Sequence, residues 1–111
     1  MATTTITKQN HWVMIENDIA IVGIIMEAKE DLGDIAMVSL PPLGKKVKKG
    51  DETLIIESVK TATEISSPLD GEIIEVNKDI SKAPKKLKEL SMPYDWLFKI
   101  KIANPSQIND L

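Results

Sequence analysis

The chain has 111 residues, is 42% hydrophobic but only 4% aromatic, and carries a net charge of −3. This length suits one domain with a core of Ile, Val and Leu, so we expect a single domain over residues 1–111. The absence of cysteine excludes disulfides and thiolate metal sites, and we expect no metal site. The negative charge argues against nucleic-acid binding, and no apolar run approaches the length of a membrane span.

The predicted elements are mainly β-strands, recognised by alternation or by β-branched residues. In chain order we expect a hairpin of strands at 11–16 and 19–22, a helix at about 26–32, strands at 35–40, 54–58, 61–66 and 72–76, a helix at 85–90, a strand at 96–102 and a last helix from Asn104 onward. Asn17-Asp18 suits the turn of the first hairpin. Gly33 suits the left-handed stop of the first helix.

The two ends and the spacing of the strands complete the predicted architecture. Residues 1–8 are expected to be a flexible N-terminus, and their start lacks the basic and apolar segments of a signal peptide. Strand follows strand at short spacing along most of the chain. This spacing predicts a small antiparallel β sandwich or barrel.

The segment from Glu57 to Ala62 places Lys60 between two of the predicted strands. A lysine at a hairpin tip has nothing to bury against, so its long stem holds the amine in water. Such a position presents an amine to a modifying enzyme. The alternative is an ordinary solvated lysine in a turn.

Two glycines flank this lysine in the sequence. Gly44 lies sixteen residues before Lys60, and Gly71 lies eleven residues after it. Each lies between strand-like runs, where the backbone needs a positive φ or a close approach by another segment. Both are therefore expected to shape the fold around the Lys60 turn.

Taken together, these features resemble the lipoyl/biotinyl carrier family and, within it, the H-protein of the glycine cleavage system. The resemblance covers roughly residues 6 to 102. Its landmarks, in order, are Gly23-Ile24, Leu32-Gly33-Asp34-Ile35, Val38, Leu40-Pro41, Leu43-Gly44, Glu57-Ser58-Val59-Lys60, Ser67-Pro68, Gly71-Glu72 and Trp96-Leu97-Phe98-Lys99-Ile100.

The resemblance implies a fold and a cofactor. The fold would be mainly β, a lipoyl-domain-like barrel-sandwich hybrid of two antiparallel sheets with short flanking helices. Biotin carriers usually have methionines beside the lysine, whereas Val59 and Thr61 stand here, so lipoate amide-linked to Lys60 is implied. The residues that would serve the attached arm are Gly44, Glu57, Ser58, Val59, Thr61, Ala62 and Gly71. Glu57 is either a contact for the attaching enzyme or a cross-strand partner of Lys60 or Lys49.

The same resemblance implies a carrier that catalyses nothing itself. Its partners would be the pyridoxal-phosphate glycine decarboxylase, the aminomethyltransferase, dihydrolipoamide dehydrogenase, and a lipoate ligase or a lipoyl/octanoyl transferase. The carrier would pass an aminomethyl group from the first to the second and electrons to the third. A monomer is expected, in the cytoplasm of a bacterium or in the mitochondrial matrix of a eukaryote.

Several positions depart from the H-protein pattern. H-proteins shelter the loaded arm in a polar cleft, and the matching positions here are His11, Glu27 and Ser39. His11 is alternatively a packing residue beside Trp12, and Glu27 a solvated helix residue near Lys29. These changes favour, as an alternative, an H-like carrier that relays lipoate or has a redox or regulatory role. An unmodified interaction domain is a third hypothesis.

Overall fold

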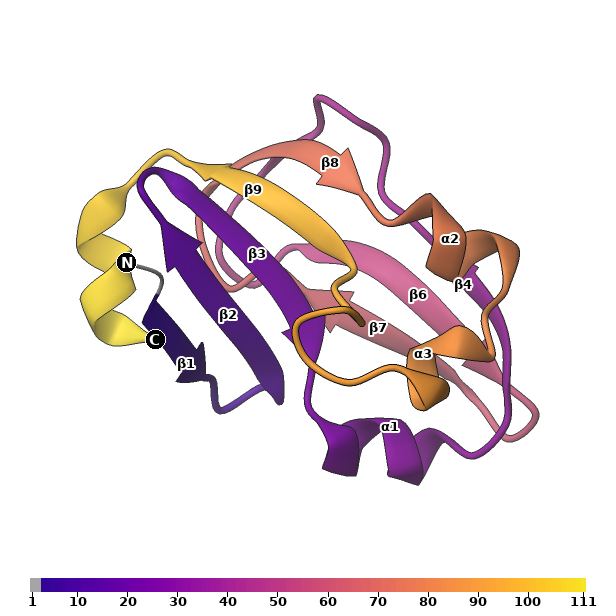
Figure 1. Ribbon diagram of the computed structural model, residues 1–111. Helices are drawn as coiled ribbons and strands as arrows, with labels where there is room; N and C mark the ends of the chain where they lie inside the picture. The colour runs from indigo at the N-terminus through magenta and orange to yellow at the C-terminus, as the bar shows by residue number, and fades with distance from the viewer. Residues whose placement is uncertain (1–2) are drawn as a thin grey trace.

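The computed structural model describes residues 3–111, which form two antiparallel sheets and four short helices (Figure 1). The elements are β1 (Thr3–Ile6), β2 (His11–Glu16), β3 (Ile19–Ile24), α1 (Met26–Leu32), β4 (Ile35–Ser39), β5 (Lys46–Val47), β6 (Glu52–Ser58), β7 (Ala62–Ser66), β8 (Gly71–Val76), α2 (Lys78–Lys82), α3 (Lys86–Glu89), β9 (Phe98–Ile102) and the 3-10 helix η1 (Pro105–Asp110). The larger sheet has the order β1-β2-β3-β9-β8-β5, and the smaller has the order β4-β6-β7. The predicted mainly β class, with two antiparallel sheets and short helices, is confirmed.

The core lies between the two sheets and is almost entirely aliphatic. In part of the sheets, one face of a strand is buried and the other is exposed, as alternation predicts. β9 shows this plainly, because Phe98, Ile100 and Ile102 are buried while Lys101 is exposed. Leu54, Ile56 and Ile65 of the smaller sheet are buried in the same cluster.

The first predicted hairpin is confirmed, although its second strand runs to Ile24 and not to residue 22. β2 and β3 pair antiparallel, with Glu16 opposite Ile19. Asn17 adopts a φ of 56°, a left-handed conformation that asparagine accepts more readily than most residues. Asn17, which the sequence predicted in this turn, therefore supplies its left-handed residue.

The N-terminal prediction was wrong for the residues that the structure describes. Residues 3–6 were expected to be flexible, but they form β1 and pair with β2, with Thr4 opposite Met14. Threonine is a good strand former, and pairing with an edge strand gives the segment its order. Residues 1 and 2 lie outside the described part of the chain.

Four other elements differ from the expectation. β9 begins at Phe98, so Trp96 precedes the strand and its carbonyl accepts a hydrogen bond from Asn77 Nδ2 at 2.8 Å. The short helix α2 and the two-residue strand β5 were not predicted. The C-terminal helix is a 3-10 helix, with Pro105 in its first turn.

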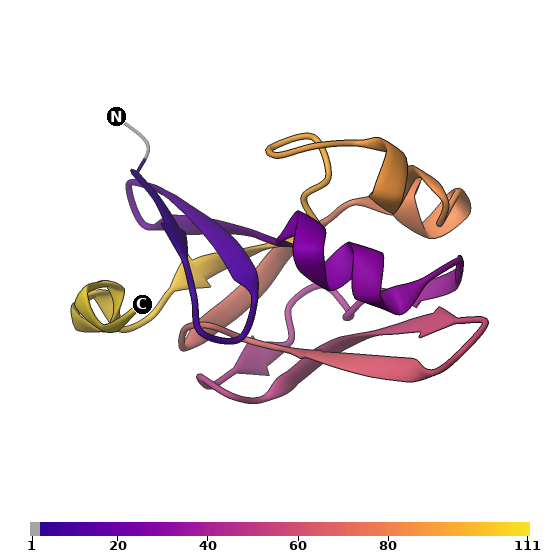
Figure 2. The same ribbon diagram turned by 90° about the horizontal axis from the view of Figure 1, so that it is seen from below.

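The helices α1, α2 and α3 gather at one end of the molecule, beside the turn between β6 and β7 (Figure 1 and Figure 2). α3 packs against α1, and α2 packs against β4. The chain termini lie near the opposite end. None of the helices in the described part of the chain has the length and apolar character needed to cross a membrane.

Candidate functional site

Lys60 lies at the tip of the hairpin formed by β6 and β7, as predicted. The last pair of the ladder is Glu57 opposite Ala62, and Ser58 N donates a hydrogen bond to Thr61 O at 2.8 Å. Lys60 is exposed, and the neighbouring Val59 is 73% exposed. Lys60 is therefore accessible on the surface of a tight turn.

The Ser58 side chain organises this turn. Its Oγ accepts hydrogen bonds from Lys60 N at 3.2 Å and from Thr61 N at 3.1 Å, and it donates to Thr61 O at 3.2 Å. A serine that bonds the amides just after it stabilises a turn without help from distant residues. Ser58 thus holds the backbone of the tip through bonds that leave the Lys60 side chain unused.

One long-range contact fastens the tip to the body of the protein. Val59 N donates a hydrogen bond to Asp34 O at 3.0 Å, in the connection between α1 and β4. Just before it, Gly33 ends α1 with φ 72° and ψ −148°. The positive φ agrees with the predicted stop, although ψ differs from the left-handed helical value.

Gly33 also makes room for the lysine. A Cβ atom at Gly33 would lie 3.5 Å from Lys60 Cε and 3.8 Å from Lys60 Nζ. The Lys60 stem thus lies across a backbone that carries no side chain. On the other side of Gly33, Lys88 Nζ donates to the Gly33 carbonyl at 2.9 Å.

The two flanking glycines lie in the body of the fold, and each has a different reason to be glycine. Gly44 has φ 83° with open space around it, and its N–H bonds Ile73 O at 2.7 Å. Gly71 does not have a positive φ. A Cβ atom there would overlap the carbonyl oxygen of Lys101 and the side chain of Ile100. Gly44 thus meets the first of the two predicted requirements, and Gly71 meets the second.

Glu57 makes neither of the ion pairs considered for it within residues 3–111, to Lys60 or to Lys49. It is half-buried, and its cross-strand neighbours are Ala62 and Met37. A contact with an attaching enzyme stays a prediction.

The structure places the three residues predicted to line an arm cleft in different environments. Glu27 is exposed in the first turn of α1, and Ser39 is exposed at the end of β4. Within residues 3–111, no hydrogen bond or ion pair joins either of them to His11.

His11 is buried in a hydrogen-bond network of its own. Its Nε2 bonds the carbonyl of Ser66 at 2.7 Å, and its Nδ1 lies 2.9 Å from the Thr7 hydroxyl. A carbonyl can only accept, so Nε2 carries the proton and Nδ1 accepts from Thr7. Burial lowers the pKa of His11 below 6.5, and the bond to Ser66 only partly offsets this. His11 therefore takes the packing role that was its alternative.

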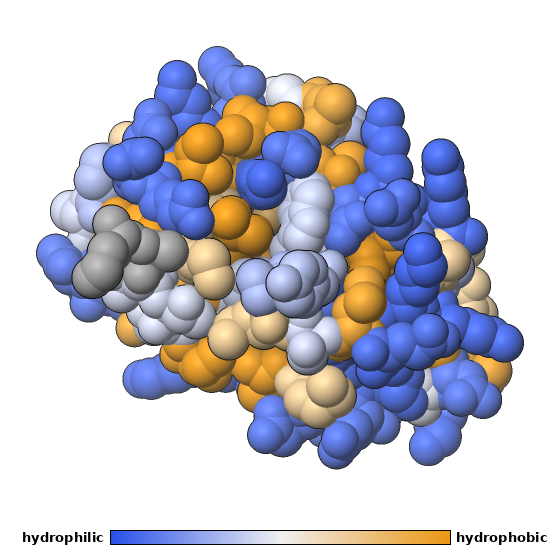
Figure 3. Space-filling model, in the orientation of Figure 1, coloured by the Kyte–Doolittle hydropathy of each residue, from blue (hydrophilic) through white to orange (hydrophobic). Residues whose placement is uncertain are grey.

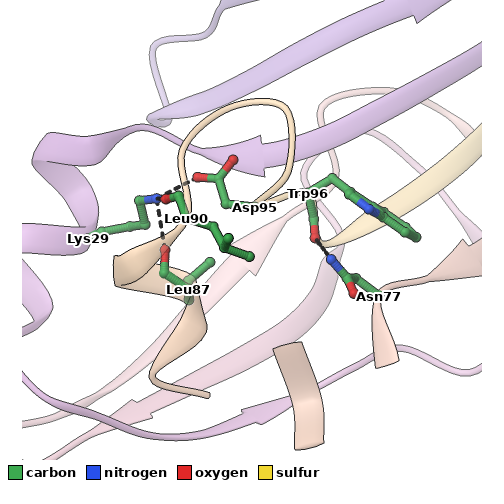
Figure 4. Close-up of polar contacts among 6 residues, drawn as sticks. All are labelled: Lys29, Asn77, Leu87, Leu90, Asp95 and Trp96. Atoms are coloured by element: carbon green, nitrogen blue, oxygen red, sulfur yellow. Dashed lines mark hydrogen bonds and ion pairs between the residues drawn. The ribbon is translucent and has the colours of Figure 1, made fainter. Parts of the chain in front are cut away.

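The sequence analysis missed a buried ion pair between α1 and the segment before β9 (Figure 4). Lys29 is 1% exposed, and its Nζ donates to Asp95 Oδ2 at 2.5 Å, to Leu87 O at 2.8 Å and to Leu90 O at 3.0 Å. One signal was available, because Lys29 lies three residues before the buried Leu32 and so on the same helix face. The pair clamps α1 against α3 and the loop that follows.

The structure thus combines two antiparallel sheets with one lysine, Lys60, exposed at the tip of a hairpin. Comparison with known proteins gives the family. The model of the glycine cleavage H-protein family matches residues 4–111. The chain belongs to this family, as its sequence indicated.

Individual relatives agree with the family match. The chain is 43% identical to the glycine cleavage system H protein of Parvibaculum lavamentivorans over 111 residues, which is all of this chain and 89% of the relative. It is 42% identical to that of Thermotoga maritima, over 95% and 85% of the two chains. A crystal structure of a glycine cleavage system H protein from Mycobacterium marinum superposes with a TM-score of 0.85 and 28% identity, over 90% of this chain and 84% of the other.

Proposed function

We propose that this chain works as the lipoyl carrier of a glycine cleavage system and that Lys60 is its attachment site. The family membership supports the system, since the H-protein is its lipoyl carrier. The observation that carries the attachment site is the Lys60 turn itself. A lysine at a tip ordered by Ser58 gives an attaching enzyme an accessible amine on a defined backbone.

The residues around the tip fit an attached arm. When bound, the lipoyl group supplies a dithiolane that carries the aminomethyl group of glycine and passes on electrons. Lys60 supplies the amide nitrogen and a flexible stem, and Gly33 leaves room for that stem. Ser58 and the bond from Val59 N to Asp34 O keep the base of the arm fixed. A rigid base with a flexible arm keeps the reactive end at a high effective concentration near successive enzymes.

The carrier role assigns no catalytic step to this chain. Its partners would be glycine decarboxylase, the aminomethyltransferase and dihydrolipoamide dehydrogenase, with a lipoate ligase or a lipoyl/octanoyl transferase attaching the arm. We propose that it acts as a monomer, wherever the other components of the system are found, which is the cytoplasm in a bacterium or the matrix in a eukaryote.

The first test is the intact mass of the chain after incubation with lipoate, ATP and a lipoate ligase. We expect a gain of one lipoyl group in the unchanged chain and in Lys49→Ala, and no gain in Lys60→Ala. Lys49 is a matched control, because it is exposed and lies beside a glycine in another turn. A lipoyl gain that persists in Lys60→Ala would refute the attachment site.

The second stage adds glycine and glycine decarboxylase to the lipoylated chain. A further gain of one aminomethyl group is the expected result. A reference H-protein, such as that of Thermotoga maritima, is treated in parallel. If the reference is loaded and this chain is not, a carrier that relays lipoate or has a redox or regulatory role replaces the glycine cleavage carrier. The departures from the H-protein pattern at His11, Glu27 and Ser39 motivate this second stage.

A further inference from the structure

A lysine-rich surface lies beside the Lys60 turn. The segment formed by α2 and α3 and the residues that join them contains five lysines, Lys78, Lys82, Lys85, Lys86 and Lys88, which we call the lysine face. Only two acidic residues, Asp79 and Glu89, share residues 78–90 with them. This segment is therefore positive in a chain whose net charge is −3.

The lysine face is free to meet a partner. All of its lysines are exposed except Lys88, which is half-buried. None of the five takes part in an ion pair within residues 3–111. Figure 3 shows hydrophilic side chains gathered over the end of the molecule formed by α2, α3 and the β6–β7 turn. Positive charge that no internal partner neutralises attracts acidic surfaces over about a Debye length.

A hollow of about 530 Å³ joins the lysine face to the hairpin tip. The residues that line it are Asp34, Ile35, Ala36, Val59, Lys85 and Lys88. Its floor includes the apolar Ile35, Ala36 and the exposed Val59, and lysines stand on one side. An apolar centre with a charged rim is the usual anatomy of a protein–protein interface.

The helix next to the lysine face, α1, has the opposite charge. α1 carries the exposed residues Glu27, Glu30 and Asp31, while its one lysine is buried and paired with Asp95. α1 and α3 are therefore neighbours of unlike charge, both close to Gly33, over which the Lys60 stem lies. Charges arranged in this way fix the orientation of an approaching partner, as well as attracting it.

We propose that the lysine face and the adjoining hollow dock an acidic protein surface that carries an apolar side chain, namely the surface around the arm entrance of the glycine decarboxylase. This proposal rests on the proposed function. An arm attached at Lys60 begins at the hairpin tip, so an enzyme that receives it approaches the tip and the surface next to it. The apolar side chain enters the hollow beside Val59, and the carboxylates of the partner face Lys82, Lys85 and Lys86.

The test measures the Kd of the unlipoylated chain for glycine decarboxylase of the same organism, so that the readout does not depend on the loaded arm. The test variant is K82E/K85E/K86E, which leaves Lys88 and its bond to Gly33 intact. The matched control is K46E/K48E/K49E, which makes the same change of charge among exposed lysines near β5. Circular dichroism and Tm establish that both variants are folded.

We expect the test variant to raise Kd by about tenfold or more at low salt, because steering by complementary charge changes association by that order. At about 0.1 M salt, where the Debye length is about 10 Å, the control should change Kd by less than about threefold, since the seven residues of β6 separate its lysines from the tip by roughly 20 Å. Raising the salt concentration should weaken binding of the unchanged chain and bring its Kd toward that of the test variant.

Three results would overturn the proposal. Equal losses in the two variants would show a response to net charge alone. An unchanged Kd in the test variant would show that the lysine face is not contacted. No binding by the unchanged chain would exclude this docking surface, whereas the lipoyl mass test on Lys60 would still decide the carrier function separately.

Discussion

Lys60 and Lys29 are two lysines close to the same helix, and the fold uses them in opposite ways. Lys60 is exposed at a turn and makes no ion pair within residues 3–111, while Lys29 is 1% exposed and bonded to three partners. The Lys60 turn is organised mainly by residues that are neighbours in the sequence. The Lys29 clamp joins residues 58 to 66 positions apart. The proposed function of Lys60 needs an accessible amine. The contribution of Lys29 to stability needs a buried amine whose hydrogen bonds are all made.

The largest predicted effect on stability is that of Lys29→Ala. This change leaves the Asp95 carboxylate buried without its partner, and removing one member of a buried ion pair costs about 3–5 kcal/mol. Chemical denaturation of the two proteins measures the loss. The conformation of the Lys60 turn should change as well, because α1 ends at Gly33, against which the Lys60 side chain lies.

The matched control for that prediction is the double variant Lys29→Met with Asp95→Leu. Replacing both charges by apolar side chains removes the desolvation cost, so most of the lost stability should return. A double variant as unstable as Lys29→Ala would show that packing volume or the bonds to Leu87 O and Leu90 O, and not the ion pair, hold the clamp together.

Gly71→Val should have the next largest effect. A Cβ atom at Gly71 would overlap the Lys101 carbonyl, so the backbones of β8 and β9 must separate, at a cost of about 1–3 kcal/mol. Thermal unfolding measures this change. Gly44→Ala is the comparison, because its Cβ meets open space and only the positive φ is unfavourable. If Gly44→Ala proved the more damaging of the two, close approach at Gly71 would not be the reason for glycine there.

The difference between these sites also explains what the sequence could and could not predict. Lys60 and Gly33 were placed correctly because a turn and a helix stop are encoded by neighbouring residues, whereas the bonds of Ser58 within the turn were not predicted. β1 and the Lys29–Asp95 pair were missed because their order depends on partners far along the chain. α2 has only five residues, too few to show a helical period. The arm cleft was transferred from a family pattern, and burial of His11 is a property of the packed fold.

The pH dependence of stability is a smaller effect and reports on His11. Burial lowers the pKa of His11 in the folded state, so the unfolded chain binds a proton at higher pH than the folded chain does. The stability from neutral His11 is therefore fully present above about pH 6.5 and is lost as the pH falls through the lowered pKa. Urea unfolding between pH 7.5 and pH 5 measures the decline, taking the range from the usual histidine pKa of about 6.5.

His11→Gln provides the control, since glutamine keeps a polar side chain that does not titrate. Stability in this variant should be flatter across the same pH range. Carboxylates contribute at lower pH, as for Asp70, whose pKa is lowered below 3.8 chiefly by the hydrogen bond from Lys49 N. An unchanged slope in His11→Gln would mean that another group titrates in this window.

The smallest predicted effect on stability is that of Lys60→Ala, which completes the comparison with Lys29. An exposed side chain without an ion pair contributes little, so the free energy of unfolding should change by less than about 0.5 kcal/mol. The bonds of Ser58 to the turn use only backbone atoms of Lys60 and Thr61, and alanine retains them. Measured beside Lys29→Ala by denaturation, this variant should separate the two roles of lysine. A loss of several kcal/mol in Lys60→Ala would instead make Lys60 part of the fold, and its proposed freedom as the base of an arm would have to be abandoned.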